Sequence, residues 1–398
     1  MAKSYEEKLE KLKNGAQLLS FSAPALHTAA FSVVFPFVPE GRAGAYHCVE
    51  HLFFERAGKR RAPEINAEMT ARGSEINGYT AKNYMCFNFV CRKEVFAEQL
   101  SLLYSMLTQK EYGEEEEESV LGVIENEIFE YDFYDNRTAD ILREAWYDER
   151  FTKSVLGTAE DLDLFTEEEI DAARESLFTD GMTIFLAGAF SEEDIGAVRR
   201  TFGELPLRPY VYAPECKPKE DKKAIEKRGG GKDLQVLVTY HAENADDELK
   251  CAAYWLKSAL FDGMDAAFLR FFDKNGFHFY SVDGSYSVLG DEIVFSFMTY
   301  IKKREKKRFL ALVDQFEEEA AWTPFLRLVK PFLFDNTVFL YDNPERLCSH
   351  YTEGWADFAR PVTLAEERGR GAEFTDVRLS ELWRKIARSK RKIYFLGK

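Results

Sequence analysis

Apolar residues along the first half of the chain follow two periods, one typical of strands and one typical of helices. Four segments are rich in Phe, Val and Leu, as buried strands are. They are 16–22, 29–37, 84–90 and 182–187. Five segments have helical spacing or helix start and stop signals. They are 5–13, 44–56, 63–71, 94–107 and a helix that begins at 114 and continues past 131. Residues 74–82 are predicted as a loop between a helix and a strand.

The second half repeats this order of elements after a change in composition. Residues 206–232 are rich in Pro, Lys and Glu and end in the run Gly229–Gly231, which is typical of a linker. Beyond the linker the pattern predicts further strands and helices in similar order. The strands are 234–240, 277–282, 292–300 and 392–396, and the helices are 246–260, two that run through 316 and 328, and 379–387. We therefore predict an N-terminal domain (1–205), a linker (206–232) and a C-terminal domain (233–398).

The helix predicted at 44–56 contains the sequence His-x-x-Glu-His. Residues four apart lie on the same face of a helix, so His47 and His51 would present two imidazoles to one point, as two ligands of a single metal ion do. Glu50 lies at the edge of that face, where its carboxylate could reach a water at the metal. The motif is the inverted form of the His-Glu-x-x-His zinc motif. The alternative is a helix whose histidines make ordinary hydrogen bonds.

Two imidazoles leave a zinc site incomplete, because catalytic zinc has three protein ligands and a water. The chain has no other cluster of His or Cys, so a third ligand is expected to be a carboxylate on a facing helix. Glu127, in the helix that begins at 114, is the candidate. Cys48 lies inside the motif but is rotated away from the imidazoles, and the six cysteines are scattered without a Cys-x-x-Cys pair, which indicates reduced thiols.

Composition narrows the class of protein. Charged residues at 31% and apolar residues at 45% indicate a globular chain, and the net charge of −16 argues against nucleic acid or an anionic membrane as partner. That charge is compatible with a basic peptide as partner. The alternative is that it only keeps the protein soluble. No apolar run approaches the roughly 20 residues of a membrane span, and the N-terminus lacks the apolar core of a secretory signal. These features predict a cytoplasmic protein.

The motif and its distance from Glu127 support a family assignment. His47, Glu50 and His51, followed by the sequence Val-Ile-Glu-Asn-Glu-Ile at 123–128, resemble the pitrilysin family of inverzincin metallopeptidases. Among these the chain is most similar to the two-domain members related to mitochondrial processing peptidase. Three further segments resemble the family. They are 73–80, similar to an Asn-Ala-x-Thr loop along the edge strand of the cleft, 156–166, which leads to the last helix of the first domain, and 276–282, similar to a Gly-Leu-x-Tyr-Ser stretch of the second domain.

The resemblance implies a fold and a mechanism. The fold is α+β, with two homologous domains, each a mixed or antiparallel sheet with helices packed on it, that face each other as a clamshell around a chamber. The implied site holds Zn²⁺ through His47, His51 and Glu127, with Glu50 as the general base that takes a proton from water and delivers it to the leaving amine. A substrate peptide would add a strand to a sheet edge beside the metal, with Asn77 as one contact. The alternative for Asn77 is an ordinary polar loop residue.

Several positions depart from the family pattern. A supporting glutamate usually precedes the ligand glutamate by seven residues, and here that position is Val120, with Glu118 nearby as a candidate substitute. Active members also carry an Arg and a Tyr in the second domain that hold the substrate. The Arg position matches Phe272, with Arg270 off register, and Tyr280 matches only after a one-residue insertion. The alternatives are a surface arginine and a core tyrosine.

The expected protein is a cytoplasmic zinc metalloendopeptidase that cleaves peptides or a small precursor inside a chamber. It would act as a homodimer, or as the metal-bearing subunit of a heterodimer whose homologous partner completes the substrate grip. The alternative is a non-catalytic subunit that binds a peptide or a partner protein, although such relatives usually lose part of the motif. A structural zinc site would need a fourth protein ligand, and only three are evident.

Overall fold

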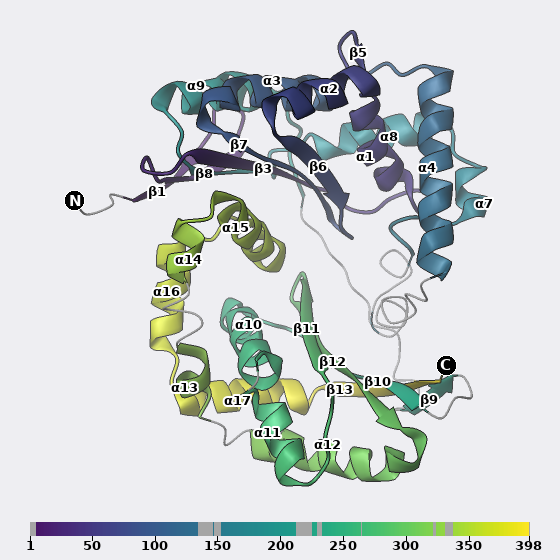
Figure 1. The fold of residues 1–398 in the computed structure, drawn as a ribbon, viewed down its shortest axis with the longest axis vertical. Helices are drawn as coiled ribbons and strands as arrows, with labels where there is room; N and C mark the ends of the chain where they lie inside the picture. The colour runs from purple at the N-terminus through teal and green to yellow at the C-terminus, as the bar shows by residue number, and fades with distance from the viewer. Residues whose placement is uncertain are drawn as a thin grey trace. The chain divides into compact units, whose positions relative to one another are not determined.

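The computed structural model describes residues 5–133, 146, 153–211, 225–228, 233–263, 265–320, 324–330 and 337–397. The chain divides into two compact units, each described here by itself (Figure 1). The first unit comprises Met1–Asp140, Glu149–Pro214 and Val338–Ala356, and the second comprises Ile141–Asp148, Glu215–Thr337 and Asp357–Lys398. Among the described residues, every helix is too short or too polar to span a bilayer.

The first unit contains a six-stranded sheet in the order β1-β2-β8-β3-β7-β6. Its strands are β1 (Glu6–Lys11), β2 (Gln17–Ser22), β3 (Thr28–Pro36), β6 (Glu75–Thr80), β7 (Tyr84–Arg92) and β8 (Thr183–Gly188). All neighbours are antiparallel except β2 and β8, which are parallel. The central strand β3 is buried along almost its whole length, as its unbroken apolar run predicts. Within the described part of the chain, β6 pairs with β7 alone and forms one edge of the sheet.

Helices cover both faces of this sheet (Figure 1). One face carries helices whose apolar residues form a core with Phe31, Val33 and Phe35 of β3. These helices are α1 (Ala45–Glu55), α2 (Ala62–Arg72), α3 (Phe96–Leu107), α8 (Glu167–Leu177) and α9 (Glu192–Thr201), and α4 (Glu114–Phe133) packs outside α1. Shorter elements connect them: β4 (Arg56–Ala57), β5 (Arg60–Arg61), η1 (Lys93–Val95), α7 (Ala159–Leu162) and η2 (Phe202–Glu204).

The opposite face is covered by α15 (Pro344–Phe358), which comes from the C-terminal part of the chain. The Trp355 indole nitrogen donates to Thr183 Oγ1 at 3.1 Å, the Tyr351 hydroxyl donates to Glu7, and Cys348 contacts the carbonyl of Ala30. The opposite face of the first sheet is therefore covered by a segment that lies, in the chain, between elements of the second unit. The short helix α14 (Thr337–Tyr341) precedes it.

The second unit repeats the topology of the first. Its sheet has the order β11-β12-β10-β13-β9, with β9 and β13 parallel and all other neighbours antiparallel. The first sheet has the same pattern in β6-β7-β3-β8-β2, where β2 and β8 are the parallel pair. The strands are β9 (Ile225–Arg228), β10 (Asp233–Ala242), β11 (Val282–Leu289), β12 (Glu292–Lys302) and β13 (Lys390–Gly397). The predicted fold class of two homologous α+β domains is confirmed.

The helices of the second unit extend the repeat. A helix follows the central strand in both units, and a 3₁₀ turn followed by a helix comes after β12 as it does after β7. The elements are α10 (Asp247–Phe261), α11 (Ala267–Lys274), η3 (Lys303–Glu305), α12 (Lys306–Ala320), α13 (Phe325–Lys330), α16 (Leu364–Glu373) and α17 (Asp376–Ala387). Their core is rich in Phe and includes Phe261, Phe268 and Phe316. No histidine occurs on α10, which corresponds to α1.

Three predictions of local structure were wrong. Residues 5–13 contain the strand β1 because each residue of Glu6–Lys11 pairs with β2, which overrides a helical composition. Residues 74–82 contain the edge strand β6, and the predicted strand at 277–282 begins only at Val282. The domain limits stay a prediction. Of the proposed linker, 212–224 and 229–232 lie outside the described residues, including Gly229–Gly231, and 225–228 form β9.

Candidate metal centre

The helix α1 is packed on two sides, which leaves one face for the motif. Val49 and Phe53 are buried in the core above the first sheet, whereas Cys48 and Leu52 pack in a second apolar cluster with residues of α4. His47 and His51 lie on the remaining face, with His47 and Glu50 buried and His51 partly exposed. The sequence prediction that Cys48 points away from the imidazoles agrees with this packing.

The helix α4 brings Glu127 to the imidazoles through its own periodicity. Val120 and Ile124 of α4 are buried against Cys48 and Leu52 of α1. Positions four and seven residues after Val120 lie on the same helical face, so the apolar stripe that docks α4 also directs Glu127 toward α1. Val120, the departure from the family pattern, thus contributes to docking, and Glu118 is exposed and takes no part in this contact.

Three ligand atoms converge at one point. His47 Nε2 lies 3.4 Å from Glu127 Oε2, His51 Nε2 lies 3.5 Å from Glu127 Oε1, and the two Nε2 atoms are 3.2 Å apart. Ligand atoms placed 2.0–2.1 Å from a tetrahedral zinc ion are about 3.3–3.4 Å from one another. Within the described part of the chain, these three residues form the one group of His, Cys, Asp and Glu arranged to hold a metal ion. The donor set and its spacing fit zinc.

Both imidazoles are neutral at physiological pH. Burial lowers the pKa of His47 to about 4, with a further contribution from the charge of His51. Burial also lowers the pKa of His51, although Glu127 opposes that shift. The contacts with Glu127 are therefore not ion pairs at pH 7, and the histidine lone pairs are available to a metal. His47 Nδ1 is buried without a hydrogen-bond partner among the described residues.

The carboxyl group of Glu50 is tuned toward proton transfer near neutrality. Burial raises its pKa to about 7, the hydrogen bond from Thr80 opposes that change, and the negative charge of Glu127 adds to it. Thr80 Oγ1 donates to Glu50 Oε2 at 2.6 Å, which holds one carboxylate oxygen in place. A general base works best when its pKa lies near the working pH. Thr80 was included in the Asn-Ala-x-Thr resemblance, but its contact with Glu50 was not predicted.

A cleft of about 590 Å³ surrounds these residues, and the edge strand β6 forms one side of it. Ile76 to Thr80 line the cleft, and Asn77 is exposed there. Ile76 is buried while Asn77 and Tyr79 are exposed, so the period of two was a signal for a strand that the loop prediction missed. A Cβ on Gly78 would lie 2.9 Å from the Phe87 ring and 3.1 Å from Phe54, so glycine lets β6 approach α1 closely.

Two glycines fix the beginning of α1 against the far wall of the cleft. Gly44, the N-cap of α1, has φ of 84°, and a Cβ there would lie 2.7 Å from the carbonyl oxygen of Leu156. Gly157 has φ of 78°, and its Cβ would lie 2.9 Å from the carbonyl oxygen of Ala43. Both positions need a residue without a side chain, because φ is positive and backbone atoms lie close. This close approach of residues 43–44 and 156–157 places Leu156 in the wall of the metal cleft.

The residues expected from the second domain lie in the second unit. Phe272 is buried in the aromatic core, and Arg270 is a half-exposed residue with Nε 3.5 Å from Asp265, as the surface alternative predicted. Tyr280 precedes β11, and its side chain is fully exposed, so the alternative of a core tyrosine was wrong. The proposed substrate contacts of Asn77 and Tyr280 stay predictions.

Comparisons with known proteins identify the family of the chain. Residues 39–159 match the family model "Insulinase (Peptidase family M16)", and residues 164–322 match the model "Peptidase M16 inactive domain". The chain is similar to the uncharacterized zinc protease YmxG of Bacillus subtilis, at 29% identity over 163 residues. It is also similar to an uncharacterized zinc protease of Mycobacterium tuberculosis, at 26% identity over 208 residues. The first match covers 40% of each chain, and the second covers 50% of this chain and 47% of the relative.

Solved structures show the same fold over the whole chain. A protease from Helicobacter pylori has a TM-score of 0.83 at 14% identity, covering 99% of this chain and 100% of the other. A peptidase M16 inactive domain from Pseudomonas fluorescens has a TM-score of 0.82 at 14% identity, covering 98% of each chain. With matches to both family models, a repeated domain topology and relatives named zinc proteases, the chain belongs to the pitrilysin family, peptidase family M16, as a two-domain member.

Proposed function

We propose that this protein is a zinc-dependent endopeptidase that hydrolyses peptides or a small peptide precursor. The convergence of His47, His51 and Glu127 at spacings that fit tetrahedral zinc carries the proposal. Glu50 lies on α1 together with His47 and His51, and its pKa is raised to about 7. The names of the curated relatives, zinc proteases, support the same activity.

The residues of the site divide the chemistry among them. His47 and His51 would hold the metal through neutral Nε2 atoms, and Glu127 would add a negatively charged ligand. Zinc held there would supply a Lewis acid that polarises the scissile carbonyl and acidifies water. Glu50 accepts a proton from the attacking water and transfers it to the leaving amine, while the hydroxyl of Thr80 holds its carboxylate in position.

The edge strand β6 is the proposed platform for the substrate. Among the described residues, no strand pairs with its outer edge, and its residues line the metal cleft. A peptide that pairs with β6 gains main-chain hydrogen bonds, which give affinity with little demand on sequence. Asn77, exposed on this strand, would contact such a peptide.

The family resemblance extends the proposal beyond the first unit. We propose that the second domain closes a chamber around the substrate and contributes Tyr280, and that the protein works in the cytoplasm as a dimer. The burial of Phe272 at the position of the family arginine supports a heterodimer, in which a homologous subunit completes the substrate grip.

Metal content and peptide cleavage, measured on the same preparations, test the proposal. The wild type should carry about one zinc per chain. Glu127→Gln should lose most of that zinc, whereas Glu50→Gln should retain it and lose cleavage of a quenched fluorescent peptide library. A wild type that stays free of metal after incubation with zinc would refute the peptidase. Zinc-loaded protein that binds peptides but cleaves none, alone or with a homologous subunit, would support the non-catalytic binding subunit instead.

A further inference from the structure

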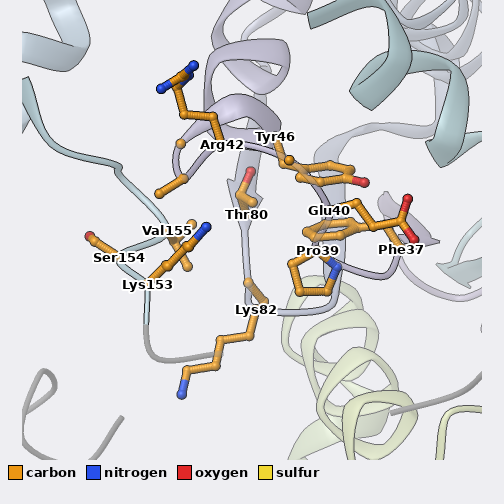
Figure 2. A pocket seen from close by; sticks show the side chains of 14 residues that line it. Phe37, Pro39, Glu40, Arg42, Tyr46, Thr80, Lys82, Lys153, Ser154 and Val155 are labelled. Atoms are coloured by element: carbon orange, nitrogen blue, oxygen red, sulfur yellow. The ribbon is translucent and has the colours of Figure 1, made fainter. Parts of the chain in front are cut away.

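A second cavity, of about 320 Å³, adjoins the metal cleft (Figure 2). It is lined by the segment that leads into α1, by the turn after β6 and by residues 153–155. Thr80 and Val155 line both this cavity and the metal cleft. We name it the side cavity. Its position beside Thr80 places it next to the carboxylate of Glu50, to which Thr80 donates its hydrogen bond.

The aromatic wall of the side cavity is rigid. The rings of Phe37 and Tyr46 stack with centroids 3.8 Å apart and planes 7° apart. The Tyr46 hydroxyl donates to the carbonyl oxygen of Val38 at 3.1 Å and lies 3.0 Å from Ser176 Oγ. Both rings are almost fully buried, so the wall exists before any ligand binds.

The charge of the side cavity is opposite to that of the chain. The protein has 69 acidic and 53 basic residues, but among the described residues the cavity is lined by Arg42, Lys82 and Lys153 and by one acid, Glu40. The charge of Arg42 is partly balanced by an acid of α8, because its Nε lies 3.5 Å from a carboxylate oxygen of Glu169. In Figure 2 the Lys153 side chain points toward the Thr80 side of the cavity, whereas Arg42 and Lys82 point away from the Phe37–Tyr46 pair.

A peptide that lies along β6 reaches this cavity. The strand ends at Thr80, beside Glu50, and the chain continues into Ala81 and Lys82, which line the cavity. An extended peptide advances about 3.3 Å per residue, so a substrate side chain about two or three residues from the cleaved bond would face the side cavity.

We propose that the side cavity is a substrate subsite for a carboxylate, with Lys153 as its contact. The inference rests on the proposed function, because it places a peptide along β6. An aspartate or glutamate side chain and a free C-terminal carboxylate offer the same chemistry. Lys153 is exposed, so the expected preference is modest, about three- to fivefold at low ionic strength.

Peptide binding to zinc-loaded Glu50→Gln tests the subsite without relying on catalysis. Twelve-residue peptides carry Asp or its uncharged isostere Asn at each position in turn, each with a free or an amidated C-terminus, and dissociation constants are measured by fluorescence anisotropy. One position should show about three- to fivefold tighter binding of Asp, and added salt should remove the difference. Tighter binding of the free than of the amidated form of the same peptide would assign the subsite to the C-terminal carboxylate, whereas an Asp preference that survives amidation would assign it to the side chain.

Charge-reversal variants in the same background decide whether the side cavity is responsible. Lys153→Glu should reverse the preference, so that Asn binds more tightly than Asp. Lys59→Glu makes the same charge change on an exposed residue outside both cavities and should keep the wild-type preference. Equal binding of every Asp and Asn pair together with equal binding of free and amidated peptides, or equal effects of the two variants, would overturn the subsite. A preferred peptide that zinc-loaded wild type never cleaves, alone or with a homologous subunit, would refute the endopeptidase and leave the subsite intact.

Discussion

Replacing Glu50 by glutamine should stabilise the metal-free protein at pH 8, although the same change should abolish peptide cleavage. The pKa of Glu50 is raised from 4.5 to about 7, chiefly by burial, so the folded protein holds this proton more tightly than the unfolded chain does. Between these two values the folded state binds more protons than the unfolded state, and stability falls as the pH rises. Glutamine cannot ionise, and its amide oxygen can still accept the hydrogen bond from Thr80.

The size of the effect follows from the shift. One pKa unit corresponds to about 1.4 kcal/mol, so ionised Glu50 costs about 3 kcal/mol at pH 8 and less than about 1 kcal/mol at pH 5. The gain of Glu50→Gln should therefore be about 3 kcal/mol at pH 8. For a domain of about 200 residues this corresponds to a rise of roughly 6–12 °C in the melting temperature of the first unit.

Differential scanning calorimetry of chelator-treated protein at pH 5 and pH 8 measures this gain. Glu118→Gln removes the same charge from an exposed position of α4 and should not gain stability selectively at pH 8. Zinc favours the charged carboxylate beside it, so the advantage of Glu50→Gln should shrink in zinc-loaded protein. A variant no more stable than wild type at pH 8, or one with an equal gain at both pH values, would refute the reasoning.

Other predictions follow from individual contacts. Thr80→Val keeps the shape of the side chain but removes the hydrogen-bond donor to Glu50, so kcat should fall about tenfold at unchanged zinc content. Thr80→Ser keeps the donor and should retain the wild-type kcat. A serine variant as slow as the valine variant would contradict this. Gly157→Ala should destabilise the protein by about 1–3 kcal/mol in urea unfolding and weaken zinc binding, because its Cβ meets backbone. Gly41→Ala, at a φ of 77° with open space around it, should keep wild-type zinc affinity, and equal zinc binding by the two variants would contradict the argument. Trp355→Phe should lower the free energy of unfolding by about 1–3 kcal/mol in the transition that zinc stabilises, because the indole of Trp355 donates a hydrogen bond to the first sheet. An effect confined to another transition would contradict this.

The sequence by itself determined the features that depend on neighbours within one helix. The spacing of His47 and His51 placed two imidazoles on one face because helical geometry is set by hydrogen bonds four residues apart. The caps at Thr166 and Ser191 are equally local, because their side chains accept hydrogen bonds from backbone N–H groups three residues later, and so is Gly73, which ends α2 with positive φ. The order of apolar segments also predicted most strands and the repeat of two domains.

Tertiary structure decided what depends on residues far apart in the chain. A strand has no hydrogen bonds of its own, so only the partner β2 made residues 6–11 a strand, and only β7 made 75–80 the edge beside the metal. Likewise, the contact of Thr80 with Glu50 and the packing of α15 beneath the first sheet join segments that no local pattern connects. The side cavity has the same origin, because folding places Lys82 and Lys153, which are far apart in the chain, in the lining of one cavity. Helical spacing can be recognised from a few consecutive residues, whereas strand pairing and cavities require the whole fold.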